Sequence, residues 1–211
     1  MRKDKKIIIG GNVPEGGCGC KPAACDDARR SLLKMAALGV AAGLSGAGSS
    51  LAQAAAQAAD ESARPQPGDH LVLDQSNASM KPLRVEDIEP GNPTLAYPFD
   101  KQTNTIRSGS RFNKVVLLRF EESELPEKVA ANAAAGILAF SSVCTHQGCD
   151  VNAWMASDGL LACFCHGSMF DPFDGGQVVA GPAPRGLPVL PISEVDGEIL
   201  VAAGFSSAPG F

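Results

Sequence analysis

The sequence has few aromatic residues, no recognisable catalytic residues and no internal repeats. Aromatic residues make up only 5% of its 211 positions, and alanine inflates the hydrophobic content of 45%. No nucleophile and no acid–base pair can be recognised, so the pattern does not indicate an enzyme that acts alone. Internal repeats are absent as well, which excludes a repeat architecture. The length suits one ordinary domain and a targeting segment.

Positive charge is scarce outside the N-terminal segment. From Ala55 onward there are ten Lys or Arg and 19 Asp or Glu, a net charge of −9, whereas the whole chain carries −5. Such a domain will not bind nucleic acid through phosphate contacts. The acidic balance favours an electropositive protein as its partner.

Cysteine and histidine are few after the N-terminal segment, but they gather in two short stretches. Residues 144–149 read Cys-Thr-His-Gln-Gly-Cys, and residues 163–168 read Cys-Phe-Cys-His-Gly-Ser. Each stretch supplies one thiolate and one imidazole. Together they make the set required by a cluster with one iron held by two Cys and the other by two His. The remaining cysteines, Cys149 and Cys165, are a matched pair able to close a bridge.

These two motifs resemble the paired loops of Rieske two-iron two-sulfur proteins, and the resemblance extends over about residues 136–191. It implies an all-β fold, an antiparallel β-sandwich with a small cluster-binding subdomain formed by two loops. It implies one two-iron two-sulfur cluster as the cofactor. The implied site consists of Cys144 and Cys163 on one iron, His146 and His166 on the other, and a disulfide between Cys149 and Cys165.

Two other interpretations of the motifs compete with this one. Two Cys and two His also suit a structural zinc site. Zinc would not account for the second cysteine pair or for the glycines beside it. A bare disulfide with incidental histidines does not explain why both stretches repeat one pattern.

Residues beside the motifs bear on the reduction potential. In the family, the serine of Cys-His-Gly-Ser donates to a bridging sulfide, and Gly167 and Ser168 occupy these places. Phe170 stands where high-potential members have a Tyr whose hydroxyl bonds a ligand sulfur, so we predict a lower potential. Phe164 replaces a common Pro. Residues 181–184, Gly-Pro-Ala-Pro, resemble a loop that covers the cluster in respiratory members.

The N-terminal segment, residues 1–54, has the pattern of a twin-arginine export signal. Arg29 and Arg30 precede a weakly apolar run rich in Gly and Ala, and small residues at 52–54 offer a cleavage site. The competing interpretation is a retained membrane anchor within residues 32–59, although Gly, Ser and Gln make this run poorly suited to lipid. Export would place the domain in the periplasm, where a disulfide persists. We assign no role to Cys18, Cys20 and Cys25.

Residues 55–69 are charged and Pro-rich, which favours a linker, and residues 70–211 form the predicted Rieske domain. Short apolar runs between Gly, Pro, Asn and Asp clusters predict strands. These are His70–Leu73, Val115–Phe120, Ile137–Ser142, Leu160–Ala162, Gln177–Ala180, Leu187–Ile192 and Glu198–Val201. The only helix candidate is Glu121–Ala135, which Pro126 interrupts. Trp154 is expected in the core, and His70 at a strand end or the surface.

We therefore expect an electron carrier, because neutral imidazole ligands raise the potential of such a cluster. The favoured context is a periplasmic respiratory oxidoreductase similar to arsenite oxidase, with the substrate chemistry on a molybdenum subunit. The alternative is the Rieske subunit of a cytochrome bc complex (ubiquinol–cytochrome c reductase), partnered by cytochrome b and a c-type cytochrome. Gln147, in place of a Leu beside the first His, counts against quinol oxidation. A ring-hydroxylating oxygenase ferredoxin is least favoured, because those lack the disulfide cysteines.

Overall fold

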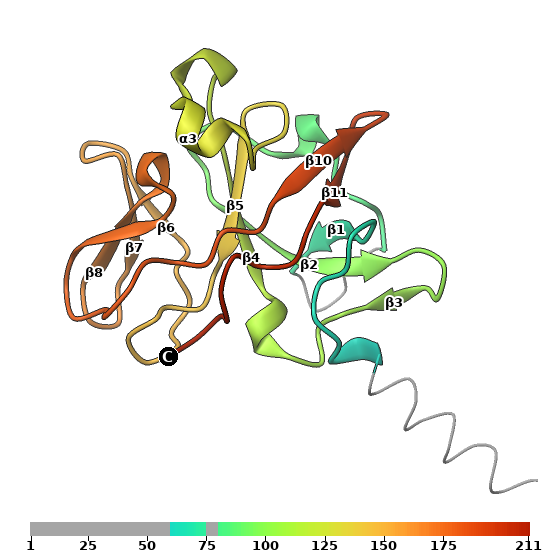
Figure 1. Ribbon diagram of the computed structural model, residues 1–211, viewed down its shortest axis with the longest axis horizontal. Helices are drawn as coiled ribbons and strands as arrows, with labels where there is room; N and C mark the ends of the chain where they lie inside the picture. Colours follow the sequence, from blue (N-terminus) through green and yellow to red (C-terminus); the bar gives the residue numbers. More distant parts are fainter. Residues whose placement is uncertain (1–59, 75–79) are drawn as a thin grey trace, which may run out of the picture. The chain divides into compact units, whose positions relative to one another are not determined.

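The computed structural model describes residues 60–74 and 80–211, whose strands form two antiparallel sheets (Figure 1). Across the seven-stranded sheet the order is β10 (Ile192–Val195), β11 (Glu198–Val201), β1 (His70–Leu73), β2 (Thr94–Asp100), β4 (Val115–Arg119) and β5 (Ile137–Ser141), with β3 (Thr105–Ile106) paired to β2. The four-stranded sheet has the order β6 (Ala153–Met155), β7 (Leu160–Cys163), β8 (Ser168–Asp171) and β9 (Gln177–Ala180). The antiparallel all-β class predicted from the sequence is confirmed.

Strands β4 and β5 are the centre of the molecule, because both of their faces are buried. Val115 and Leu117 pack into one apolar core with β1 and β11, whereas Val116 and Leu118 pack into a second core. The second core also contains side chains of β7 and β8. Side chains alternate across a strand, so a strand buried on both faces shows an unbroken apolar run. The small sheet is thereby fixed against the large one.

The segment 187–191 is not the regular strand that its apolar run predicted. Pro188 and Pro191 lack the N–H groups that a ladder needs. The segment instead lies along the edge of β5, where the Leu190 N–H donates to the Ala139 carbonyl over 2.9 Å. Only its last predicted residue, Ile192, begins a strand. β5 and β10 are the two ends of the strand order. This segment pairs with β5 and leads directly into β10, so the large sheet curves around the first core.

The helix candidate contains only short pieces. A 3₁₀ turn, η3 (Glu122–Glu124), is followed by α3 (Glu127–Ala130), which begins directly after Pro126. Three further 3₁₀ turns connect strands, namely η1 (Val85–Asp87), η2 (Arg111–Asn113) and η4 (Pro172–Asp174). The pattern missed strands β2, β3, β6 and β8. In β2 the internal Pro98 hides the strand, since proline usually argues against one.

Residues 60–69, which lie within the predicted linker, are hydrogen-bonded to the β-structure. Arg107, only 4% exposed, donates to both carboxylate oxygens of Asp69 over 2.7 and 3.0 Å. The same guanidinium donates to the backbone carbonyl of Asp60 over 3.2 Å. The Asn113 side chain donates to the Ala63 carbonyl over 2.7 Å. This part of the chain therefore packs as a portion of the domain.

The predicted export signal, the anchor within residues 32–59 and the three N-terminal cysteines lie outside the described residues. Within residues 60–74 and 80–211, none of the helices has the length and apolarity needed to cross a membrane.

Candidate metal centre

The two Cys/His motifs form matching turns. Residues 144–149, the first loop, follow β5, and residues 163–168, the second loop, join β7 to β8. In each loop the glycine N–H donates to the carbonyl of the first cysteine, over 2.9 Å for Gly148 and 3.0 Å for Gly167. Both glycines have a positive φ, +77° and +74°. Glycine adopts this conformation without steric cost, which explains its place in each motif.

The first cysteines of the two loops supply a buried pair of thiols. Cys144 and Cys163 are 2% and 1% exposed, and neither forms a disulfide. Burial raises the pKa of the Cys163 thiol, and its hydrogen bond with Cys144 raises it further. Backbone N–H groups of Cys165 and His166 donate to the Cys163 sulfur and act in the opposite direction. A bound cation would favour the thiolates, so metal binding here would release protons.

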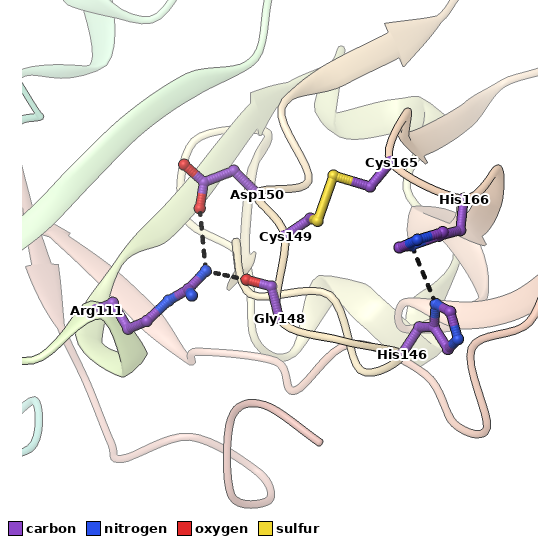
Figure 2. The surroundings of a disulfide bond; sticks show 7 residues. All are labelled: Arg111, His146, Gly148, Cys149, Asp150, Cys165 and His166. Atoms are coloured by element: carbon purple, nitrogen blue, oxygen red, sulfur yellow. Dashed lines mark hydrogen bonds and ion pairs between the residues drawn. A yellow bond between two sulfur atoms is a disulfide. The ribbon is translucent and has the colours of Figure 1, made fainter. Parts of the chain in front are cut away.

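The two histidines supply a separate pair of nitrogen donors. The Nδ1 atoms of His146 and His166 lie 3.3 Å apart, with the ring planes at 89°. Nitrogen ligands about 2.0–2.1 Å from a tetrahedral metal are themselves about 3.3–3.4 Å apart. Figure 2 shows the two rings approaching each other from the two loops. His166 is exposed and His146 partly exposed, so this donor pair lies at the surface.

A disulfide between Cys149 and Cys165 joins the two loops, as the resemblance implied (Figure 2). The sulfur atoms of these two residues and of Cys163 lie within 4.8 Å of one another, but only Cys163 keeps a thiol. Among the residues that the structure describes, no other three candidate donors gather this closely. The four predicted ligands therefore form two pairs, which suits two irons better than one tetrahedral zinc ion.

The residues expected to tune the site surround the thiol pair. Ser168 is 1% exposed, and its Oγ accepts the Ala183 N–H over 3.2 Å. Its own O–H is therefore left to donate elsewhere. Phe170 is fully buried and belongs to the same apolar core as the two free thiols. A Cβ on Gly181 would lie 2.4 Å from the Ser168 Cα, so residues 181–184 pack directly on the second loop.

The tip of the molecule, formed by the two loops and residues 179–184, has no formally charged side chain of its own. Neither loop contains a charged side chain, and neither do residues 179–184. Phe164 in the second loop is 72% exposed, and Val179 in β9 is 54% exposed. The acidic balance that favoured an electropositive partner therefore comes from other parts of the domain.

Two polar contacts of the first loop had no sequence signal. Thr145 is fully buried and donates its hydroxyl to the Arg185 carbonyl over 2.6 Å. Arg111 donates to the Gly148 carbonyl and lies 3.9 Å from Asp150 (Figure 2). Both join segments that are 37 or 40 residues apart in the chain. Only the fold could bring them together.

The two remaining sequence expectations concern residues away from the loops. Trp154 is partly buried and packs edge-on to Phe120, with ring centroids 5.4 Å apart. His70 begins β1, where its Nδ1 lies 3.1 Å from a Glu198 oxygen. Trp154 thus packs against the core without being buried in it, and His70 is at a strand end, as expected.

Comparison with known proteins adds a family match and several relatives. The family model described as Rieske [2Fe-2S] domain matches residues 83–191. A putative respiratory nitrate reductase subunit Rieske of Haloferax mediterranei is 40% identical over 104 residues, covering 49% of this chain and 46% of the relative. The cytochrome bc1 complex Rieske iron-sulfur subunit of Streptomyces lividans is 31% identical over 132 residues, covering 61% and 78%.

Among solved structures, the plasma membrane Rieske protein PetC3 from Synechocystis PCC 6803 is 34% identical, with a TM-score of 0.32. The match covers 43% of this chain and 77% of that one. This chain spans about half the length of the Haloferax relative.

Proposed function

Since this chain belongs to the Rieske [2Fe-2S] domain family, we propose that it is the electron-transfer subunit of a respiratory oxidoreductase. Its cofactor is one two-iron two-sulfur cluster, which supplies one-electron transfer when bound. The observation that carries the proposal is the division of the donors into a buried thiol pair and an exposed imidazole pair. The disulfide holds the two contributing loops together.

Each donor pair has a distinct task. Cys144 and Cys163 would hold the inner iron in a water-poor core, where N–H groups of the second loop compensate the thiolate charge. His146 and His166 would hold the outer iron, and their rings provide the route to a partner. Each ring would keep one N–H, and the presence of that proton would be coupled to the oxidation state of the iron that the ring holds. The reduction potential should therefore fall as the pH rises.

We propose that residues 1–54 direct the folded domain to the periplasm by the twin-arginine route. The Cys149–Cys165 disulfide supports an oxidising compartment, because such bonds rarely persist in the cytosol. A retained anchor within residues 32–59 would tether the domain to the inner membrane, where the same tip would still face the periplasm. Mass determination of the mature protein would decide between cleavage and retention.

The favoured complex is one similar to arsenite oxidase, in which a molybdenum subunit delivers the electrons. Phe170 is buried in the same core as the thiol pair and has no hydroxyl to donate to it. This supports a reduction potential below that of the Tyr-containing members, which favours the complex similar to arsenite oxidase. The alternative, a cytochrome bc complex with cytochrome b and a c-type cytochrome, is supported by the sequence likeness to bc1 subunits. Gln147 is exposed beside His146 and offers no apolar contact to a quinol there.

The cofactor is tested on purified holoprotein by iron and acid-labile sulfide analysis and electron paramagnetic resonance. We expect two irons, two sulfides and one signal on reduction. His166→Gln should abolish that signal, whereas His70→Gln, the matched control outside both loops, should preserve it. Zinc in place of iron, or a signal that survives His166→Gln, would contradict the proposal.

The complex is tested by tagging this chain in its own organism and identifying the proteins that purify with it. A molybdenum subunit supports the favoured complex, and cytochrome b with quinol oxidation supports the alternative. Isolation of the loaded chain with neither would refute both assignments while leaving the cofactor assignment intact.

A further inference from the structure

The C-terminal segment, residues 205–211, lies against the metal-binding end of the molecule. The Ser206 N–H donates to the Val189 carbonyl over 2.8 Å, and its Oγ accepts the Val189 N–H over 2.9 Å. A Cβ on Gly148 would lie 3.1 Å from the Phe211 ring, so the segment reaches the first loop. In Figure 1 the end marked C accordingly lies beside the loops below the four-stranded sheet.

Arg185 connects this segment to the loops. Its guanidinium donates to the carbonyls of Ala208 and Gly210 over 2.8 and 2.6 Å, and to the Ser207 hydroxyl over 3.5 Å. Its own carbonyl accepts the Thr145 hydroxyl over 2.6 Å. One residue thus contacts the C-terminal segment through its side chain and the first loop through its backbone.

The residues just before Arg185 contact the second loop. The Ala183 N–H binds the Ser168 Oγ, and Gly181 packs too closely on Ser168 to accept a side chain. The position of residues 181–185 therefore decides where the Ser168 hydroxyl points. A side chain that holds these residues will also hold that donor.

We propose that Arg185 is a positioning residue that uses the C-terminal segment to hold residues 181–185 over both metal-binding loops. The inference rests on the proposed cluster between the loops. With its Oγ accepting the Ala183 N–H, the Ser168 hydroxyl would be left to donate to the cluster, and such a donor would favour the reduced form. Loss of Arg185 loosens this arrangement, so the reduction potential falls and the cluster is lost more readily.

The test compares holoproteins in a mutant cycle. Arg185→Ala and deletion of residues 207–211 should lower the midpoint potential by similar amounts, and the combination should lower it no further. Release of iron to a chelator should become about tenfold faster, because loss of groups that orient metal ligands typically weakens metal affinity by about 10–100-fold. Arg185→Lys, which keeps the charge and a donor, should recover part of the potential.

Arg84→Ala is the matched control, because its guanidinium is paired with Glu86 away from the loops. It should leave the midpoint and the release rate unchanged. Hydrogen exchange provides a second readout, since the Ala183 amide should exchange faster in Arg185→Ala and not in the control.

A normal midpoint in folded, cluster-loaded Arg185→Ala, or additive shifts in the cycle, would overturn the inference. If Arg185→Ala does not retain the cluster, normal midpoints in both Arg185→Lys and the deletion variant would overturn it instead. A wild-type protein without iron and sulfide is a different result, because it would overturn the proposed function itself.

Discussion

The substitution Phe170→Tyr tests how the core around the thiols sets the reduction potential. Phe170 lies in β8, is fully buried and shares its apolar core with Cys144 and Cys163. The substitution adds a hydroxyl where the present side chain has none. The family resemblance implies that a Tyr hydroxyl at this position reaches a ligand sulfur. A donor there stabilises the reduced cluster, whose sulfurs carry more negative charge.

The expected size follows from hydrogen-bond energies. A hydrogen bond to a charged group contributes about 1.5–3 kcal/mol, and only the difference between the two redox states alters the potential. A difference of about 1–1.4 kcal/mol corresponds to a rise of about 40–60 mV for one electron. A hydroxyl that found no partner would instead cost about 1–3 kcal/mol of stability without a rise.

The assay is a spectroelectrochemical titration at fixed pH and salt, paired with denaturant unfolding of the same samples. Phe140→Tyr is the control, because Phe140 is 1% exposed in the same core but lies on β5. It should lose stability and keep its potential. An unchanged potential in loaded Phe170→Tyr, or an equal rise in the control, would refute the reasoning.

Three further predictions concern stability, each measured by urea unfolding. Arg107→Met should cost about 3–5 kcal/mol, because it leaves buried Asp69 unpaired; a loss no larger than that of exposed Arg84→Met would contradict this. Replacing Cys149 and Cys165 by Ser should lower the free energy of unfolding by about 3 kcal/mol, because the disulfide closes a loop with a sequence separation of 16. An unchanged free energy of unfolding would contradict this. Burial, and to a smaller extent the charge of Lys101, lower the pKa of His70 below its ordinary value of 6.5. As the pH falls, the unfolded chain therefore protonates this histidine at a higher pH than the folded chain does. The free energy of unfolding should fall as the pH drops below about 6.5, and it should fall less steeply in His70→Gln. Equal pH slopes in the two proteins would show that His70 is not the cause.

Much of the metal centre could be predicted from sequence because its chemistry is local. Each loop carries its candidate ligands, its turn glycine and its bridge cysteine within six consecutive residues. The turn hydrogen bonds of Gly148 and Gly167 each run to a cysteine within the same motif, so the turn itself is local. The strands at 70–73, 177–180 and 198–201 were predicted to the residue, since turn residues bound each short run.

Other elements could not be predicted from local pattern. The apolar run 187–192 resembled a strand, but its two prolines leave it as an irregular edge of β5. Residues 60–69 resembled a linker, because the pattern could not show that Arg107 would pair with Asp69. For residues 60–69 a partner distant in the chain decided the conformation, and for 187–192 the two prolines outweighed the apolar pattern.

The sequence by itself determined which atoms are available as ligands and how each loop turns, because these depend on neighbouring residues. Only the tertiary structure decided that the thiols are buried while the imidazoles reach the surface. It also brought Arg185 against the first loop, where its carbonyl binds Thr145, and against the C-terminal segment, where its side chain binds Gly210. Burial and long-range hydrogen bonds depend on how β4 and β5 pack between two cores, which short-range spacing does not encode.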